Sequence, residues 1–275
     1  MKEYFGFQVA DLDPNLAAHL ADIEERAPMR RAENEERESL LNLTSLREQV
    51  YQFLREEMQK GRLLPGSTIN PTELSERLGI SKTPLRDALI KLETEQFVTI
   101  LPRRGVRVND LRLRDIRNYY QIIGALEAGV IVEVFDQLGT AQIKEMRKLN
   151  AEMRAAVLSD SFDLYYYRNL EFHNVYLSLT DNDDLKRLIT PMKQRLYDFP
   201  RRSYIKEWEM TNCDEHDRFI ELLTRGDRHV AARHMRDVHW SFRVQEKYIR
   251  RFYSLVAEQI QAAHARAGKN SKLTE

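Results

Sequence analysis

Apolar residues recur at helical spacing along most of this 275-residue chain, and beyond Leu111 the pattern runs almost without a break. Polar stretches such as "QLGT", "LSDS", "TDND" and "TRGD", together with the region around Pro200, separate the candidate helices. We predict helices over residues 113–138, 140–158, 161–179, 182–199, 207–225 and 227 to about 265. Consecutive helices of this kind predict a mainly α protein whose larger part, residues 110–265, is an all-α bundle.

The segment upstream of the bundle has a different pattern, in which three short helices precede two short strands. A first helix ends at Gly61, "PTELSERLG" predicts a second that ends at Gly79, and a third runs to about Glu95. The alternation of apolar residues in "FVTILPRRGVRVND" predicts a β-hairpin. Three helices with a tight turn before the third, followed by a hairpin, predict a winged helix-turn-helix over residues 41–109.

The two ends of the chain lack such patterns. Residues 1–40 are rich in Asp and Glu, and Leu16, Leu20 and Ile23 indicate no more than a short amphipathic helix. We expect residues 1–40 to form an extension and residues 266–275 to form a flexible tail.

Composition narrows the functional classes. Lys plus Arg equals Asp plus Glu at 43 each, so the charge of the whole chain does not indicate a polyanionic partner. Cys213 is the only cysteine, which excludes an intrachain disulfide and a cysteine-based zinc site within one chain. The N-terminus lacks the features of a signal peptide, and no apolar run approaches the ~20 residues of a membrane span. We therefore expect a cytoplasmic protein without a membrane partner.

Positive charge is nevertheless concentrated in the predicted helix-turn-helix. The second helix of such a motif lies in the major groove of DNA, with its first residues near the base edges. Hydroxyl groups there can bind phosphates, lysine and arginine can reach guanine N7 and O6, and arginines on a wing can enter the minor groove. The candidate DNA-binding residues are Ser81, Lys82, Thr83, Arg86, Arg103 and Arg104.

Any one of these side chains alone is as well explained by an ordinary solvated surface. Their coincidence at the turn, the helix start and the hairpin tip favours DNA as the partner. Lys91, further along the same helix and beside Glu93, is expected on the solvated face.

The motifs of this segment resemble those of a known family. The "G-x-L-x-P-G" turn, the "L-G-I-S-x-T-P-L-R-x-A-L" core and the "R-R-G-V" wing are similar to the winged helix-turn-helix of the GntR family of bacterial transcription regulators. That family usually has arginine at the position of Lys82. Because lysine is a point charge and not a bidentate fork, we expect a different base preference at this contact.

Histidines form the second candidate site. Asn169 and His173 are four residues apart and share one face of a helix with apolar neighbours. His216 continues into an apolar stripe on a later helix, and His239 shares the stripe of the last helix, with His234 as second choice. His229, His234 and His239 are spaced by five, a step that turns an α-helix by about 140°, so they cannot all face the core.

Two interpretations of the buried histidines remain open. Convergence on a divalent cation would satisfy neutral imidazoles on three helices, with the Asn169 amide oxygen or a water completing the shell. Alternatively, each histidine satisfies its own local hydrogen bonds.

A second resemblance bears on this choice. Residues 111–250 are similar to the FCD effector-binding domain of the FadR-like GntR subgroup, in which many members hold a metal. The resemblance implies a divalent metal, zinc first and nickel or manganese as alternatives. Asparagine in place of the family's usual aspartate implies weaker binding of the cation. The ligands so implied are Asn169, His173, His216 and His239.

The family's effector-binding arginine corresponds to Ile123 in this chain, so a carboxylate effector would need Arg195 or the metal as its anchor. Aromatic residues at helical spacing could line the pocket, although such residues more often form core. The candidate effector-binding residues are Tyr120, Ile123, Arg195 and Tyr197.

Together these patterns predict a transcription regulator. The resemblance implies that it is a metabolite-responsive repressor, because repression is the commoner mode in the family. We expect a homodimer on a palindromic operator, with the hinge near Asn109 and Asp110. A metal-dependent hydrolase is the first alternative, although no general base accompanies the histidines, since Glu171 should point away from His173. A ligand-free architectural DNA-binding dimer is the second.

Overall fold

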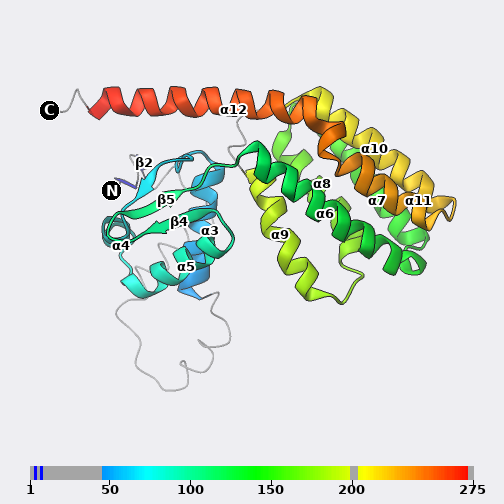
Figure 1. The fold of residues 1–275 in the computed structure, drawn as a ribbon, viewed down its shortest axis with the longest axis horizontal. Helices are drawn as coiled ribbons and strands as arrows, with labels where there is room; N and C mark the ends of the chain where they lie inside the picture. The colour runs from blue at the N-terminus through cyan, green and yellow to red at the C-terminus, as the bar shows by residue number, and fades with distance from the viewer. Residues whose placement is uncertain (1–2, 5–6, 9–44, 199–203, 272–275) are drawn as a thin grey trace, which may run out of the picture.

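The computed structural model describes residues 3–4, 7–8, 45–198 and 204–271. The sequence predictions for residues 9–44 and for the last residues of the tail fall outside this part of the chain. The described residues form a small α/β domain and a larger helical domain (Figure 1). A two-stranded pair, β1 (Glu3–Tyr4) and β2 (Phe7–Gln8), is described near the N-terminus.

The first domain is a winged helix-turn-helix. Its helices are α3 (Leu46–Gln59), α4 (Pro71–Leu78) and α5 (Lys82–Thr94), and its strands are β3 (Thr68–Ile69), β4 (Val98–Leu101) and β5 (Gly105–Val108). The antiparallel sheet has the order β3-β5-β4. The predicted two-stranded wing was therefore incomplete, because β3 pairs with β5 along Thr68–Arg107 and Ile69–Val106. Two residues are too short a segment for the alternation of apolar residues to reveal a strand.

Local chemistry explains the turn in this motif. The Asn70 side chain accepts hydrogen bonds from the backbone N–H groups of Thr72 and Glu73, and Pro71 occupies the first turn of α4. Gly79 ends α4 in the left-handed conformation at φ 65°, where other residues are strained. Leu85 and Leu92 are buried on the inner face of α5, which leaves the start of that helix facing outward.

The second domain is a helical bundle with one continuous core, as predicted. Its elements are α6 (Leu113–Glu133), the 3₁₀ turn η2 (Phe135–Gln137), α7 (Thr140–Leu158), α8 (Phe162–Leu177), α9 (Asp183–Asp198), α10 (Lys206–Thr224), α11 (Arg228–His234), the π-helical turn η3 (Met235–His239) and α12 (Phe242–Ser271). Helix α7 has the predicted bounds, whereas α6 ends at Glu133 and not at residue 138. Helix α12 continues beyond residue 265 to Ser271, into the segment expected to be a tail.

The prediction of one continuous last helix was wrong. The backbone N–H of Trp240 donates to the carbonyl of Met235 at 2.8 Å, a five-residue step that widens the helix into a π turn. Directly opposite, α6 contributes Gly124, where an added Cβ would lie 2.8 Å from Trp240 Cβ. The close packing of α6 against this turn is a tertiary feature, so helical periodicity could not reveal it.

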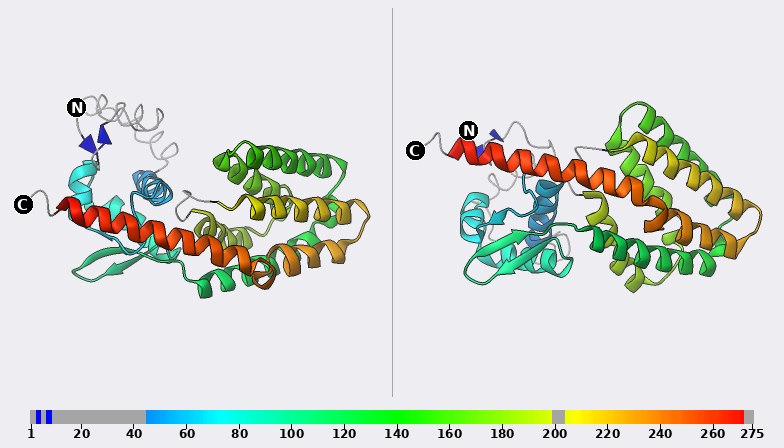
Figure 2. Two further views of the ribbon diagram at one scale, coloured as in Figure 1. Left: turned by 90° about the horizontal axis from the view of Figure 1, so that it is seen from above. Right: turned by 45° about the horizontal axis from the view of Figure 1, so that its top comes forward.

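The two domains meet through α9 and the segment that links β5 to α6. Arg195 on α9 donates to Gln96 in the first domain at 3.1 Å and to the backbone oxygen of Asp110 in the linker at 3.4 Å. Tyr119 on α6 also donates to Gln96, at 3.0 Å. Helix α12 leaves the bundle and extends past the first domain, as the three views agree (Figures 1 and 2). Among the described residues, no helix has an apolar stretch of sufficient length to cross a membrane.

Candidate metal centre and nucleic-acid interface

Three histidines from separate elements converge in the core of the helical domain. His173 lies on α8, His216 lies on α10, and His239 ends the π turn η3. One nitrogen of each ring can be chosen so that all three atoms lie within 4.8 Å of one another. The three side chains are 6% exposed or less. Two nitrogens that ligate one zinc ion at about 2.1 Å lie at most about 4.2 Å apart, so a small shift of the side chains would let one divalent cation reach all three.

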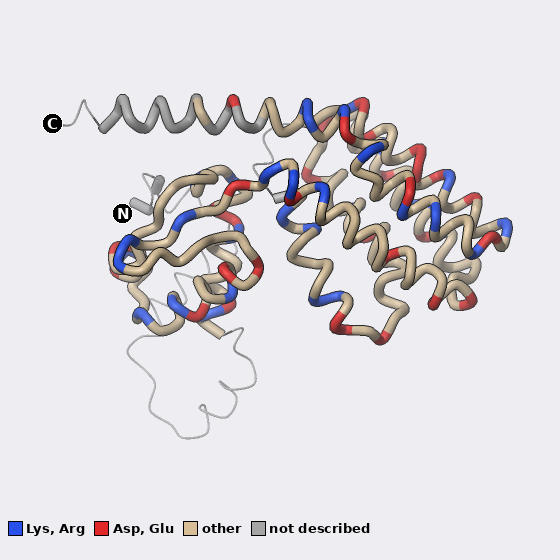
Figure 3. Tube along the Cα trace, viewed as in Figure 1, with Lys and Arg blue, Asp and Glu red and all other residues tan. Residues whose placement is uncertain are grey.

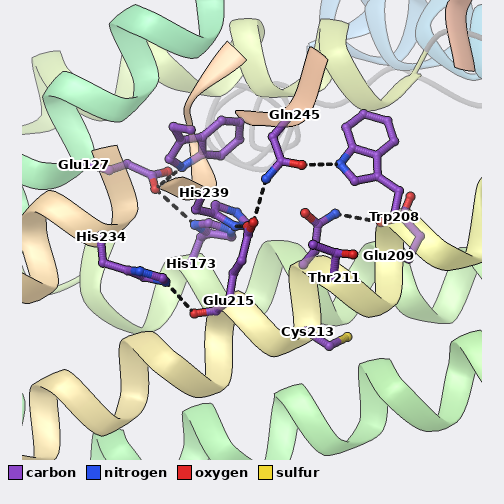
Figure 4. Close-up of polar contacts among 12 residues, drawn as sticks. Glu127, His173, Trp208, Glu209, Thr211, Cys213, Glu215, His234, His239 and Gln245 are labelled. Carbon is purple, nitrogen blue, oxygen red and sulfur yellow. Dashed lines mark hydrogen bonds and ion pairs between the residues drawn. The ribbon is translucent and has the colours of Figure 1, made fainter. Parts of the chain in front are cut away.

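Carboxylates orient two of the three imidazoles. His173 Nδ1 lies 3.1 Å from Glu127 Oε2 on α6, and His239 Nδ1 lies 2.9 Å from Glu215 Oε2 on α10 (Figure 4). A carboxylate at Nδ1 selects the tautomer with the proton on that atom and directs Nε2 inward. His173 Nε2 has no hydrogen-bond partner among the described residues, although it is buried. This arrangement is typical of a histidine prepared to ligate a metal.

His216 is held by packing. Its ring stacks on Phe172 with centroids 3.9 Å apart and planes inclined by 16°. Neither ring nitrogen has a hydrogen-bond partner in the described part of the chain. Burial, followed by the charges of the other histidines, lowers the pKa of His216 well below its usual value, and burial lowers the pKa of His173 to about 3. Neutral imidazoles are the form that a metal binds.

The remaining candidate ligands, Asn169 and His234, occupy different positions relative to the three histidines. Asn169 is buried one turn before His173 on α8, so its amide lies on the same face. The Nε2 atom of His234 lies 2.8 Å from the backbone oxygen of Glu215, which gives His234 a supporting position beside the cluster. The assumption of regular α geometry was wrong here, because the π turn allows His234 and His239 both to contact Glu215.

Sequence reasoning missed the buried ion pair behind His173. Glu127 Oε1 lies 2.5 Å from Lys193 Nζ, while Tyr176 and the Trp240 indole donate to Glu127 Oε2 at 2.6 and 2.7 Å. Burial by itself would raise the pKa of the Glu127 carboxyl, but Lys193 and His173 outweigh that effect and lower it. The available signal was a lone glutamate within the apolar run "IIGALEAGVIV".

A small aromatic cavity of about 50 Å³ adjoins His239. Of the candidate effector residues, Tyr120 lines it, whereas Ile123 is buried in the core and does not line it. Arg195 lies at the domain junction instead, and the side chain of Tyr197 is outside the described part of the structure. Glu209, which the sequence analysis did not single out, does line the cavity. It precedes His216 by seven residues on α10, so helical spacing could have indicated it.

The candidate DNA-binding residues are all exposed. Ser81 is the N-cap residue of α5, its hydroxyl makes no capping hydrogen bond, and no acidic residue lies in the first turn. Lys82 and Arg86 border a groove that the wing residue Ile100 also lines. Basic and acidic residues are interspersed over both domains, so position rather than surrounding charge distinguishes these candidates (Figure 3). The candidates are Ser81, Lys82, Thr83, Arg86, Arg103 and Arg104.

Lys91 has a structural partner. Its ammonium lies 2.9 Å from Glu48 and 3.8 Å from the centroid of the Tyr51 ring, both on α3. These contacts hold the C-terminal part of α5 against α3. The N-terminal end of α5 remains free to face a ligand.

Comparison with known proteins agrees with this architecture. Residues 46–108 match the family described as bacterial regulatory proteins, gntR family, and residues 118–239 match the FCD domain. The chain is 25% identical over 189 residues to the uncharacterized HTH-type transcriptional regulator YdhC of Bacillus subtilis, covering 68% of this chain and 84% of YdhC. It is 27% identical over 145 residues to the HTH-type transcriptional repressor RspR of Escherichia coli, covering 52% of this chain and 64% of RspR.

The fold also resembles a solved structure, that of E. coli McbR/YncC. The superposition has a TM-score of 0.58 at 18% identity and covers 79% of this chain and 99% of the other. A winged helix-turn-helix joined to an α-helical bundle, matched by these two family models, defines a DNA-binding transcription regulator. The chain belongs to the GntR family of bacterial regulators and carries an FCD domain. Members of this family bind DNA operators and often act as dimers, and the FCD domain is associated with metal binding.

Proposed function

We propose that the protein is a metal-containing, metabolite-responsive repressor. The single observation that supports this most strongly is the convergence of His173, His216 and His239 within 4.8 Å beside a cavity. His173, His216, His239 and the Asn169 amide would hold the cation, and zinc best fits a set of three imidazoles with one oxygen. When bound, the cation would supply a positive anchor for an oxygen or nitrogen donor of the effector.

The DNA-binding surface that we propose consists of the start of α5 and the wing tip. Ser81 and Thr83 would contact phosphates, Lys82 and Arg86 would read base edges in the major groove, and the wing arginines Arg103 and Arg104 would enter the minor groove. Two copies of this surface in a homodimer would match a palindromic operator with half-sites about one helical turn apart.

Coupling between the two domains would depend on their junction. Arg195 contacts the linker oxygen of Asp110 and also Gln96, so a movement of α9 changes the contacts of the DNA-binding domain. An effector that binds more tightly to one placement of the DNA-binding domains shifts the population toward it, with reciprocal effects on DNA and effector affinity.

The test begins with elemental analysis of the purified full-length protein, followed by selection of operators from a random DNA library. We expect about one equivalent of a divalent metal per chain and a selected site with two-fold symmetry. His173→Ala and His239→Ala should lose the metal, whereas His229→Ala, which changes an exposed histidine, should retain it. Retention of metal by the first two variants, or selection of sites without symmetry, would contradict the proposal.

A further inference from the structure

The cavity beside His239 has aromatic walls. Tyr120, Trp208, Trp240 and Phe252 line it, and neighbouring rings stand at steep angles to one another. The planes of Tyr120 and Trp240 are inclined by 72°, with centroids 5.3 Å apart, and those of Trp208 and Phe252 by 62°, with centroids 6.1 Å apart. Aromatic rings that surround a small space can attract a cation that lies over one of their faces.

Glu209 places a carboxyl group in the wall of this cavity. Its side chain is 8% exposed, and the Asn212 amide donates to Oε2 at 3.0 Å. Among the described residues that line the cavity, no lysine or arginine is present. Burial raises the pKa of Glu209 to about 7, against smaller opposing effects of Tyr165, Asn212 and the charge of His239. A buried carboxyl group without a cationic partner is costly to ionise, and a cation that enters the cavity would remove that cost.

The two buried basic residues of α9 are already engaged. Lys193 is 5% exposed and pairs with Glu127, and Arg195 contacts Gln96 and Tyr119 at the domain junction. Neither residue lines the cavity. The cavity therefore presents a carboxyl group and aromatic rings to a ligand. No lysine or arginine among its described lining residues pairs with that carboxyl group.

We propose that this cavity binds the ammonium group of a small amine effector, with Glu209 as its counter-ion and the aromatic rings as its cage. The inference deepens the proposed function, because it names the chemical class of the effector that the metal-containing domain senses. A volume of about 50 Å³ suits a primary ammonium group with a short chain and not a bulky headgroup.

A chain of hydrogen bonds connects the cavity to the metal-binding cluster. The Trp208 indole donates to Gln245 Oε1 at 2.9 Å, and the Gln245 amide donates to Glu215 Oε1 at 2.7 Å (Figure 4). Glu215 in turn holds His239 Nδ1 at 2.9 Å. Because Gln245 lies on α12, a ligand that displaces Trp208 would act on both that helix and a metal-binding histidine.

Intrinsic fluorescence provides a direct test, because Trp208 and Trp240 are the only tryptophans of the chain and both line the cavity. The full-length protein would be titrated with propylammonium, with 1-propanol as the neutral analogue and with butyrate as the anionic analogue. Each titration would be run on metal-free and zinc-loaded protein, because an amine can also ligate zinc. We expect a saturable change with propylammonium in both forms, and no saturable change with the alcohol, or with butyrate in the metal-free form.

The matched variants are Glu209→Gln, which keeps the shape and removes the charge, and Glu221→Gln on the exposed face of the same helix. Loss of a charged hydrogen-bonding partner should weaken propylammonium binding about 10- to 100-fold in Glu209→Gln, with no change in Glu221→Gln. Trp208→Phe should weaken binding less, because a phenyl ring retains part of the cation–π attraction. If Glu209→Gln does not fold, Asn212→Leu, which removes the donor that orients Glu209, replaces it with the same expectation.

Three results would overturn the inference: equal binding of propylammonium and propanol, unchanged affinity in Glu209→Gln, or tighter binding of butyrate than of propylammonium by metal-free protein. The last result would identify a carboxylate site. Metal content and operator binding, measured separately, report on the proposed function itself. Normal values of both without propylammonium binding would refute only the effector class, whereas propylammonium binding by a protein that takes up no metal under any condition would refute only the metal centre.

Discussion

Glu127 Oε2 lies 3.1 Å from His173 Nδ1, while the other oxygen of the same carboxylate lies 2.5 Å from Lys193 Nζ. One carboxylate thus orients an imidazole of the proposed metal site and neutralises a buried lysine. Removal of the carboxylate should affect metal affinity through the first role and the free energy of unfolding through the second. The two roles can therefore be measured separately.

Glu127→Gln should weaken metal binding about 10- to 100-fold, because His173 loses the carboxylate that sets its tautomer. It should also lower the free energy of unfolding by about 3–5 kcal/mol, because Lys193 is left buried without a counter-ion. The double variant Glu127→Gln/Lys193→Met should recover most of the stability but not the metal affinity. Urea denaturation and competition with a chromophoric chelator measure the two quantities, and parallel recovery of both would contradict the division of roles.

Arg86→Ala should reduce affinity for a selected operator by about 1–3 kcal/mol if Arg86 reads a base, and should affect random DNA far less. Arg243→Ala, at an exposed position of α12, is the matched control. Fluorescence anisotropy at two salt concentrations measures both. An equal loss on all sequences would show that Arg86 contacts only phosphate.

Gly124→Ala should lower the free energy of unfolding by about 1–3 kcal/mol, because the new methyl group would collide with Trp240 Cβ at 2.8 Å in a packed interface. Gly129→Ala on the same helix meets no atom within 4 Å and should be neutral or stabilising by about 0.5–1 kcal/mol. Thermal and urea denaturation of both variants test this contrast. Equal stability would show that η3 can move away from α6 at little cost.

The stability of the metal-free protein should depend on pH through Glu209. Because burial raises its folded pKa to about 7 from 4.5, the protonated carboxyl stabilises the fold below pH 4.5, and this contribution is lost as pH rises through 7. Its full size is about 3 kcal/mol. Glu209→Gln should therefore show a smaller decrease in the free energy of unfolding between pH 5 and pH 8 than the parent protein. Identical pH dependence of the two proteins would exclude Glu209 as the titrating group.

Arg195→Met should loosen the domain junction, because the linker oxygen of Asp110 and the Gln96 side chain both lose a donor. We expect trypsin to cleave the linker, for example after Arg112, several-fold faster. Arg187→Met, at an exposed position of the same helix, should leave the cleavage rate unchanged. Unchanged cleavage in Arg195→Met would show that other contacts hold the junction.

Most of the fold could be predicted from periodicity and turn chemistry. The apolar stripes and caps predicted α7 to the residue and placed α5 and its exposed start, because burial of one face repeats every 3.6 residues. The same periodicity predicted that Asn169 and His173 share the buried face of one helix, and both are buried on α8. Strand β3 and the π turn were missed, since each is stabilised by contacts with residues distant in the sequence.

By itself, the sequence determined the two-domain order, the helical class of the second domain, the exposed start of α5 and the histidines that converge in the core. Only the tertiary structure decided the partners: Glu127 with His173 and Lys193, Glu215 with His239, and Glu209 within an aromatic cavity. The physical reason is that periodicity records which face of an element is buried. Which atoms meet within a buried face depends on the packing of several helices at once, and no single segment encodes it.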